Sequence, residues 1–184
     1  MSYPGAVMVY GFSLTSDHFP YWCRLGDNLT SGSQVINGLD SLYGGVGVYL
    51  IYSFSLSGNT LTVHRSNYLA SEPTMPATPA SGQDSFSFTI GAAPGAGYAR
   101  VNGTTQLNAT ARPYLTVALY NIDSQNTYMS QSGVNAGFNF DSIPAGRYLL
   151  ISNYFKEGIA YSFHRYLAIQ PGDNDLGRVN LVLP

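Results

Sequence analysis

Charge is scarce in this sequence. Only 10% of its 184 residues are Asp, Glu, Lys or Arg, and Lys156 is the only lysine. The net charge is −2. Positively and negatively charged residues are both spread along the chain, and the sequence has no cluster of basic residues. A nucleic-acid partner is not expected, because such binding needs clustered Lys and Arg. Ser, Thr, Asn, Gln, Gly and Tyr must supply the polar surface, which suits a subunit packed against neighbours, or a protein outside cells, better than a diffusing cytosolic enzyme.

Cysteine is nearly absent. Cys23 stands alone, so an intrachain disulfide is impossible and a disulfide scaffold is excluded. We interpret Cys23 as a small buried hydrophobe rather than a thiol activated by Arg24. No apolar run reaches the length of a transmembrane helix. The N-terminal residues lack the pattern of a signal peptide. We therefore expect either that a signal was removed or that the protein is made in a cytoplasm and reaches its destination by assembly or lysis.

Patterns of catalytic residues are also missing. The three histidines, at 18, 64 and 164, lie in separate segments without metal-ligand spacing. No Gly-x-Ser-x-Gly elbow marks a serine nucleophile. Glu72 and Glu157 are the only glutamates, and no acid pair resembles a glycosidase dyad. We predict that the protein is not an enzyme and that it carries no cofactor.

The sequence does hold many short segments with strand character. Hydrophobic residues make up 45% of the chain, enough for a packed core. Alternating apolar and aromatic segments are separated by turn signals every 8–12 residues, which is typical of antiparallel sandwiches. Sustained helical periodicity is absent, and 39–43 is the best candidate for a helical turn. Strands are expected at 6–16 (with a possible bulge at Gly11), after Pro20, and at 46–56, 61–65, 86–90, 114–120, 127–131, 137–140, 147–153, 161–169 and 177–183.

We predict an all-β fold of two antiparallel β-sandwich-like domains. Segments rich in Gly, Ala and Thr place a boundary near 91–112. The expected division is an N-terminal β domain at 1–97, a linker or crossover strand at 98–112, and a C-terminal sandwich at 113–184. The Pro-rich segment 72–83 is expected to be a long loop or lid.

The stretch from Phe138 to Ile151 organises the second half. Phe138 and Phe140 alternate with Asn139, and Pro144 and Gly146 carry turn chemistry, so it predicts a strand, a tight turn and a strand.

Together with the segments 114–121 and 171–181, this stretch resembles the carboxypeptidase-regulatory-like, or prealbumin-like, β-sandwich module. The motifs are Leu-Thr-Val-x-Leu-Tyr-Asn, Gly-x-Phe-x-Phe-x-x-Ile-Pro-x-Gly-x-Tyr-x-Leu, and a Pro-Gly-Asp ending that runs into Leu-Gly-x-Val-x-Leu. The resemblance covers about the last 70 residues and implies a prealbumin-like or immunoglobulin-like sandwich. The resemblance says little about function, because such modules are accessory domains of many different proteins.

The whole chain resembles, more generally, the tail and baseplate structural proteins of tailed phages. The basis is the initial Met, an early strand at Tyr10–Phe12, and the low charge.

Aromatic residues near loops are the candidate contact residues. Rigid, amphipathic tyrosines suit interfaces and sugar sites, although packing within the sandwiches would also account for them. A loop at 154–160 is expected to carry aromatics at both ends. The candidate interface or ligand residues are Tyr21, Trp22, Tyr154, Phe155 and Tyr161.

Asp173 and Asp175 are weak candidates for calcium ligands. The Gly and Glu positions that complete an EF-hand loop are missing, and an Asx-rich turn between two strands would equally account for the pattern.

The sequence favours a non-enzymatic structural or binding subunit of a virion, as a phage tail, baseplate or decoration component that acts by oligomeric assembly. Its expected partners are copies of itself, other virion subunits and, for the loops, a host surface glycan. The alternatives are an extracellular adhesin or pilus-type subunit and a carbohydrate-binding accessory module. The expected location is the virion, or alternatively outside the cell.

Overall fold

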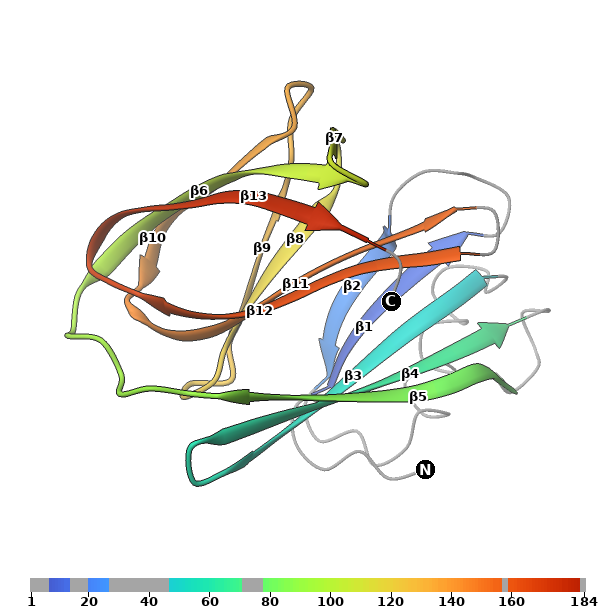
Figure 1. Cartoon of the computed structure of the whole chain (residues 1–184), viewed down its shortest axis with the longest axis horizontal. Coiled ribbons are helices and arrows are strands. Elements are labelled where there is room, and N and C mark those ends of the chain that lie inside the picture. Colours follow the sequence, from blue (N-terminus) through green and yellow to red (C-terminus); the bar gives the residue numbers. More distant parts are fainter. Residues whose placement is uncertain (1–6, 14–19, 27–46, 71–77, 157–158, 183–184) are drawn as a thin grey trace. The chain divides into compact units, whose positions relative to one another are not determined.

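The computed structural model of the chain describes residues 7–13, 20–26, 47–70, 78–156 and 159–182 (Figure 1). Side chains are described for residues 52, 54–65, 85–154 and 161–182. All regular structure in these residues is β-strand, so the predicted all-β class is confirmed. Within this part of the chain, no helix has the length and apolarity to cross a membrane. The helical turn expected at 39–43 lies outside the described residues.

The chain divides into two compact units, Met1–Thr89 and Ile90–Pro184. The first domain was expected to end at residue 97, with a linker or crossover strand at 98–112. In the structure, most of that segment is a strand that lies in the middle of a sheet of the C-terminal unit.

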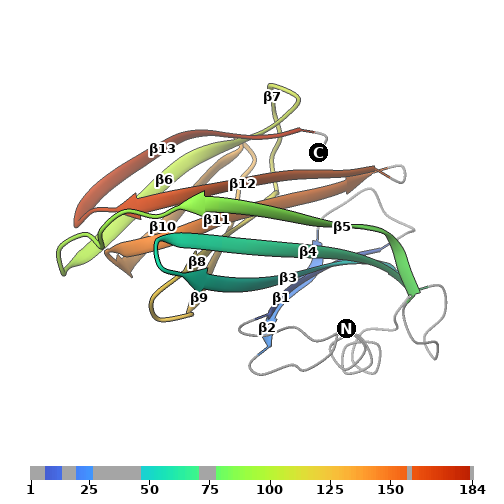
Figure 2. The same ribbon diagram turned by 60° about the horizontal axis from the view of Figure 1, so that its bottom comes forward.

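The N-terminal unit contains one five-stranded antiparallel sheet, in the order β2-β1-β3-β4-β5. Figure 2 shows β3, β4 and β5 side by side. The hairpin expected from residues 46–56 and 61–65 is confirmed, and the ladder of β1 and β2 shifts register after Gly11, where a bulge was expected. The strands are β1 (Val7–Ser13), β2 (Pro20–Gly26), β3 (Gly47–Ser57), β4 (Thr60–Ala70) and β5 (Thr78–Thr89).

Strand β5 corrects one expectation. The segment 72–83 was predicted to be a loop because of its prolines, but β5 begins at Thr78, and Thr78 and Pro79 pair with the end of β4. Proline is tolerated there because β5 is an edge strand, where one row of backbone groups needs no partner. Residues 71–77 lie outside the described part.

The C-terminal unit is a sandwich of two sheets, as predicted. One sheet has the order β10-β6-β13, with β7 paired to β6, and the other has the order β12-β11-β8-β9. The strands are β6 (Tyr98–Leu107), β7 (Thr110–Ala111), β8 (Thr116–Asn121), β9 (Thr127–Gln131), β10 (Gly137–Pro144), β11 (Gly146–Lys156), β12 (Ile159–Ile169) and β13 (Gly172–Leu181).

Alternate side chains from both sheets form one hydrophobic core, because side chains separated by two positions on a strand share a face. Its buried members are Ala99, Val101, Leu115, Val117, Leu119, Phe138, Phe140, Ile143, Tyr148, Leu150, Tyr154, Ile169, Val179 and Leu181.

Strands β6 and β13 pair in parallel, in an otherwise antiparallel unit. Parallel neighbours cannot be joined by a hairpin. Here the strands β7 to β12, which belong to both sheets, lie between β6 and β13 in the chain. They bring β13 beside β6 in the same direction.

The prediction of a strand, a tight turn and a strand over residues 138–151 is only partly correct. Both strands exist, but β10 pairs with β6 whereas β11 pairs with β8 and β12, so the segment around Ala145 is a corner between sheets and not a hairpin turn. A bulge at Asp141–Ser142, with Ser142 at φ 57°, bends β10 before the corner. The hydroxyl of buried Tyr148 donates a 2.7 Å hydrogen bond to the carbonyl of Pro144 and holds the corner closed.

The loop expected at 154–160 is also corrected. The ladder of β11 and β12 continues through Tyr154↔Tyr161 and Phe155↔Ala160 to Lys156↔Ile159. Residues 157 and 158 lie outside the described part. Aromatic and β-branched residues on both strands favour this long ladder.

An ion pair closes the same end of the C-terminal unit as the corner. The guanidinium of Arg147 pairs with both carboxylate oxygens of Asp123 and also donates to the carbonyl of Gly91. This hydrogen-bonded pairing lowers the pKa of Asp123 below its ordinary value.

Replacing Tyr148 with Phe tests the corner. We expect Tyr148→Phe to lower the free energy of unfolding by about 1 kcal/mol, because one partly buried hydrogen bond is lost while the packing stays. Urea denaturation measures the change. Tyr128→Phe is the matched control, because the ring of Tyr128 packs edge-on against Tyr148 and no described group hydrogen-bonds to its hydroxyl. Equal stability of Y148F and Y128F would contradict the role of the corner.

A second substitution is expected to stabilise the protein. Asn108 and Ala109 join β6 to β7 with φ values of 48° and 63°, as in a type I′ turn, where Gly is favoured at the second position. Ala109→Gly removes the cost of a left-handed residue with a Cβ, so the free energy of unfolding should rise by about 1 kcal/mol. Ala111→Gly in β7 is the control and should lower stability. A melting temperature for A109G at or below that of the wild type would contradict the turn assignment.

Candidate functional site

The outer face of the β10-β6-β13 sheet is polar. On β6, Ala99 and Val101 point to the core, so the alternate residues Tyr98, Arg100 and Asn102 point outward. The same alternation on β10 turns Asn139 and Asp141 outward, between the buried residues Phe138, Phe140 and Ile143. Asparagine, aspartate and arginine thus lie on the outer face of a sheet whose buried residues are apolar or carry a hydroxyl.

Part of this face is held together by its own charges. The guanidinium of Arg100 on β6 pairs with the carboxylate of Asp141 on β10 at 3.0 Å. The amide of Asn139 donates a 2.8 Å hydrogen bond to the other oxygen of Asp141. Both members of the ion pair are more than half exposed, so the pair orients side chains more than it stabilises the fold.

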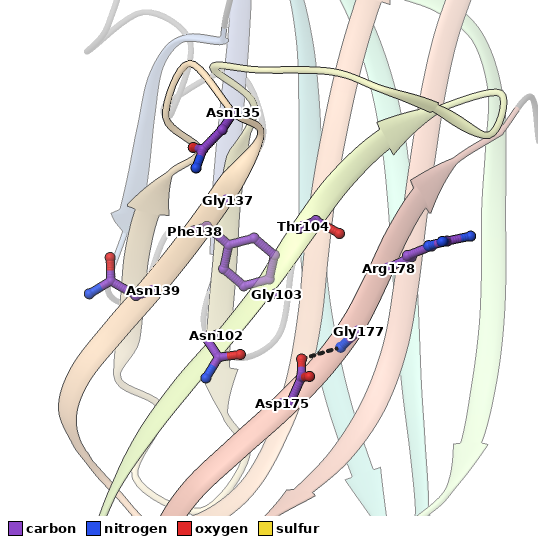
Figure 3. Close-up of a pocket in the computed structure, with 10 residues that line it drawn as sticks. All are labelled: Asn102, Gly103, Thr104, Asn135, Gly137, Phe138, Asn139, Asp175, Gly177 and Arg178. Carbon is purple, nitrogen blue, oxygen red and sulfur yellow. Dashed lines mark hydrogen bonds between the residues drawn. The ribbon is translucent and has the colours of Figure 1, made fainter.

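A shallow hollow of about 560 Å³ lies on this sheet (Figure 3). Asn139, which bonds to Asp141 of the ion pair, is one of its lining residues. The volume of the hollow falls within the range of small-ligand sites, about 300–1,000 Å³. The polar side chains that line it are Asn102, Thr104, Asn135, Asn139, Asp175 and Arg178.

Glycines line part of the hollow. A Cβ on Gly103 would lie 2.7 Å from the ring of Phe138 and 2.9 Å from the carbonyl oxygen of Gly177, so no other residue fits there without a shift. Gly177 itself has φ +67° and lies where the pairing of β13 with β6 changes register. Figure 3 shows the Phe138 ring beside Gly103, between the ribbons of β10 and β6.

The loop of residues 132–136, which contributes Asn135 to the hollow, is fixed by a buried hydroxyl pair. Thr105 Oγ1 lies 2.8 Å from Ser132 Oγ and 2.5 Å from the carbonyl oxygen of Arg112. Ser132 Oγ accepts a 2.8 Å hydrogen bond from the backbone N–H of Leu115. Both hydroxyls are almost fully buried, so the loop is anchored at its base.

The same anchored end presents apolar side chains to solvent. Val134, within the loop, is 78% exposed, and Tyr114 is 40% exposed. The backbone N–H of Tyr114 bonds to the carbonyl of Ser132, which ties the two segments together. We call Tyr114 and Val134 the apolar tip.

The aromatic residues selected from the sequence lie elsewhere. Tyr154 is buried in the core, and its hydroxyl accepts a 2.7 Å hydrogen bond from Arg112, whose guanidinium lies 4.8 Å from the ring centre. Tyr161 is half-buried and its ring lies 6.3 Å from that of Tyr154. The side chains of Tyr154 and Tyr161 therefore pack mostly within the C-terminal unit, and little of their surface is available to a partner.

The other selected aromatics are described by their backbone alone. Phe155 lies on β11 opposite Ala160, and Tyr21 and Trp22 lie on β2, with Trp22 opposite Gly11. Their side chains lie outside the described part of the structure.

The two weak metal candidates lie two positions apart on β13. Asp175 lines the hollow, and its Oδ1 accepts a hydrogen bond from the backbone N–H of Gly177. Asp173 pairs in the ladder with Arg100. Among the described residues, no three His, Cys, Asp or Glu side chains gather as metal ligands would.

Sequence reasoning missed Asn102, Asn135 and the apolar tip. The alternation of residues 98–106 could have indicated a strand with a polar face, but the Gly and Thr content suggested a linker or a crossover strand. Asp175 meets Asn102 only through the parallel register of β13 and β6. A long-range pairing of this kind leaves no local signal in the sequence.

Replacing Ser132 with Ala tests the anchor of the loop. The variant leaves the buried N–H of Leu115 without its acceptor, so the free energy of unfolding should fall by about 1–3 kcal/mol. Hydrogen exchange at the Leu115 amide should accelerate at the same time. Ser130→Ala on β9 is the control and should change neither quantity; wild-type exchange at Leu115 in S132A would contradict the anchor.

Comparisons with known proteins add little to this geometry. No family model and no curated protein sequence matches the chain. Among solved structures, it is similar to a candidate carbohydrate binding protein from Pseudomonas aeruginosa, with 18% identity and a TM-score of 0.32. The match covers 45% of this chain and 90% of that one, and at this level the likeness concerns only a β-rich fold.

Proposed function

We propose that the protein is a non-enzymatic structural subunit that acts by assembling with copies of itself. The observation that carries this proposal is the apolar tip, where Val134 is 78% exposed on a loop that buried hydrogen bonds hold in place. A rigid, exposed apolar group binds a partner without the entropy cost of ordering a flexible loop.

The composition supports the same proposal. With only 10% charged residues, neighbouring subunits repel one another weakly when they pack. Exposed tyrosine side chains such as that of Tyr114 are typical of the centres of protein interfaces.

The setting we propose is a virion, with the protein as a tail, baseplate or decoration component. This part of the proposal is supported by the general resemblance to structural proteins of tailed phages. An extracellular adhesin or pilus-type subunit is the alternative setting, and it would use the same contact chemistry.

A binding role is the second candidate function, and the polar hollow favours it. The hollow brings planar polar side chains together on three strands, outside the core. This role does not need the apolar tip, so either function can exist without the other.

A double substitution in the apolar tip tests assembly. In Tyr114→Asn with Val134→Ser, asparagine tolerates the positive φ of 62° at position 114, so the backbone should keep its shape. If the tip lies in the interface, the dissociation constant of the assembly should rise at least about tenfold. Sedimentation velocity over a range of micromolar concentrations measures this change, and electron microscopy of the wild type shows whether the assemblies are rings, tubes or fibres.

Leu56→Ser is the matched control, because Leu56 is 47% exposed beside the β3–β4 turn of the other unit. It should assemble as the wild type does. A wild type that stays monomeric at every concentration, or a double variant that assembles normally, would reject the proposal.

A further inference from the structure

We propose that the hollow on the β10-β6-β13 sheet binds a neutral saccharide, which is read by a row of three side chains, Asn139, Asn102 and Asp175. The inference deepens the binding role given above as the second candidate function, and it is independent of the apolar tip. Its basis is the position, hydrogen bonding and charge of these residues.

The three side chains form one row across the sheet. Asn139 on β10 is the register partner of Asn102 on β6, and Asn102 is the register partner of Asp175 on β13. Neighbouring strands lie about 4.8 Å apart, so two amides and a carboxylate follow one another at roughly that spacing. All three line the hollow.

The side chains of this row have donors and acceptors that the hydrogen bonds within the described structure do not use. Among the described residues, no group hydrogen-bonds to the amide of Asn102, which offers a donor and an acceptor. Asn139 donates to Asp141, which leaves its carbonyl oxygen, and Asp175 uses Oδ1 for Gly177, which leaves Oδ2.

This set of groups matches hydroxyl-rich ligands. Each sugar hydroxyl both donates and accepts, so two hydroxyls can bond to one planar amide or carboxylate. Acceptors outnumber donors in the row, which suits a ligand that brings many O–H donors. Thr104, at the edge of the hollow, adds one group that can do either.

Beside the polar row, the hollow has an apolar floor. It is small: Gly103 and the edge of the Phe138 ring line it, and Phe138 is only 4% exposed. A pyranose ring has apolar C–H groups on its faces, which such a floor can cover. An alanine at position 103 would collide with the Phe138 ring and with the carbonyl oxygen of Gly177.

Charge argues for a neutral ligand. Asp175 and Arg178 are the charged residues among those that line the hollow, and their charges cancel. Arg178 extends away from the Asn102 side chain in Figure 3, so the row itself offers no cation to a phosphate or sulfate group. A single carboxylate is also too few for a calcium site, which takes several acidic oxygens.

The test is a screen of the full chain on a glycan array that holds neutral, sialylated and sulfated oligosaccharides. The strongest neutral glycan is then titrated by calorimetry or ligand-observed NMR. We expect binding to neutral glycans, and we expect Asn102→Ala to weaken it about tenfold, since both hydrogen bonds of the amide are lost. Asn126→Ala, an exposed amide in the β8–β9 turn, is the matched control and should bind as the wild type does.

Asp175→Asn separates the ligand classes, because it keeps the shape of the row and removes its charge. A neutral saccharide should bind a few-fold more weakly, since a charged acceptor is the stronger one. Tighter binding of sialylated or sulfated glycans by D175N than of neutral ones would overturn the neutral assignment. So would binding that appears only with added calcium and disappears with EDTA.

The outcome can be distinguished from a failure of assembly. The Tyr114→Asn, Val134→Ser variant should keep the same saccharide affinity per chain, even if it no longer assembles. The inference is overturned if no glycan on the array binds, or if Asn102→Ala binds the best glycan as tightly as Asn126→Ala does while thermal melts show both variants folded.

Discussion

The C-terminal unit depends on one corner, at which the chain leaves one sheet after Pro144 and enters the other at Gly146. The hydrogen bond from Tyr148 to the Pro144 carbonyl fixes where this change occurs. It thereby decides that Phe138 and Phe140 of β10 meet Leu150 of β11 inside the core. Because side chains alternate along a strand, the choice of inward residues also decides which residues face out. The polar outer face is therefore a consequence of how the core is closed.

The loop of residues 132–136 connects the two proposed surfaces. Val134 belongs to the apolar tip and its neighbour Asn135 lines the hollow, while Ser132 at the base of the loop is buried and hydrogen-bonded. A single anchored segment thus presents an apolar group and an amide side by side. Assembly through the tip would set many hollows at fixed spacings, and weak single sites would then act together with a higher combined affinity.

The fold could be predicted from the sequence where the signal was local. Alternation identified the β3–β4 hairpin and the strands around Phe138 and Leu149, and the motif resemblance supported a sandwich in the second half. Local signals failed at residues 78–83, where Pro79 on an edge strand favoured a loop prediction, and at 154–160, where a paired ladder was predicted to be a loop. They failed at the hollow for a different reason. Asn102 and Asp175 become neighbours only when the last strand pairs with β6, and nothing near either residue in the sequence records that pairing.

The parallel pairing of β6 and β13 also has a consequence for biosynthesis. Every other strand of the C-terminal unit is made between these two, so β6 leaves the ribosome long before its partner exists. Until residues 172–181 emerge, one side of β6 is an open edge that can pair with other nascent chains. Contacts between residues so distant in sequence also form slowly. The unit is therefore complete only when β13 arrives, and a chain that ends before residue 172 would keep this edge open and be prone to aggregation.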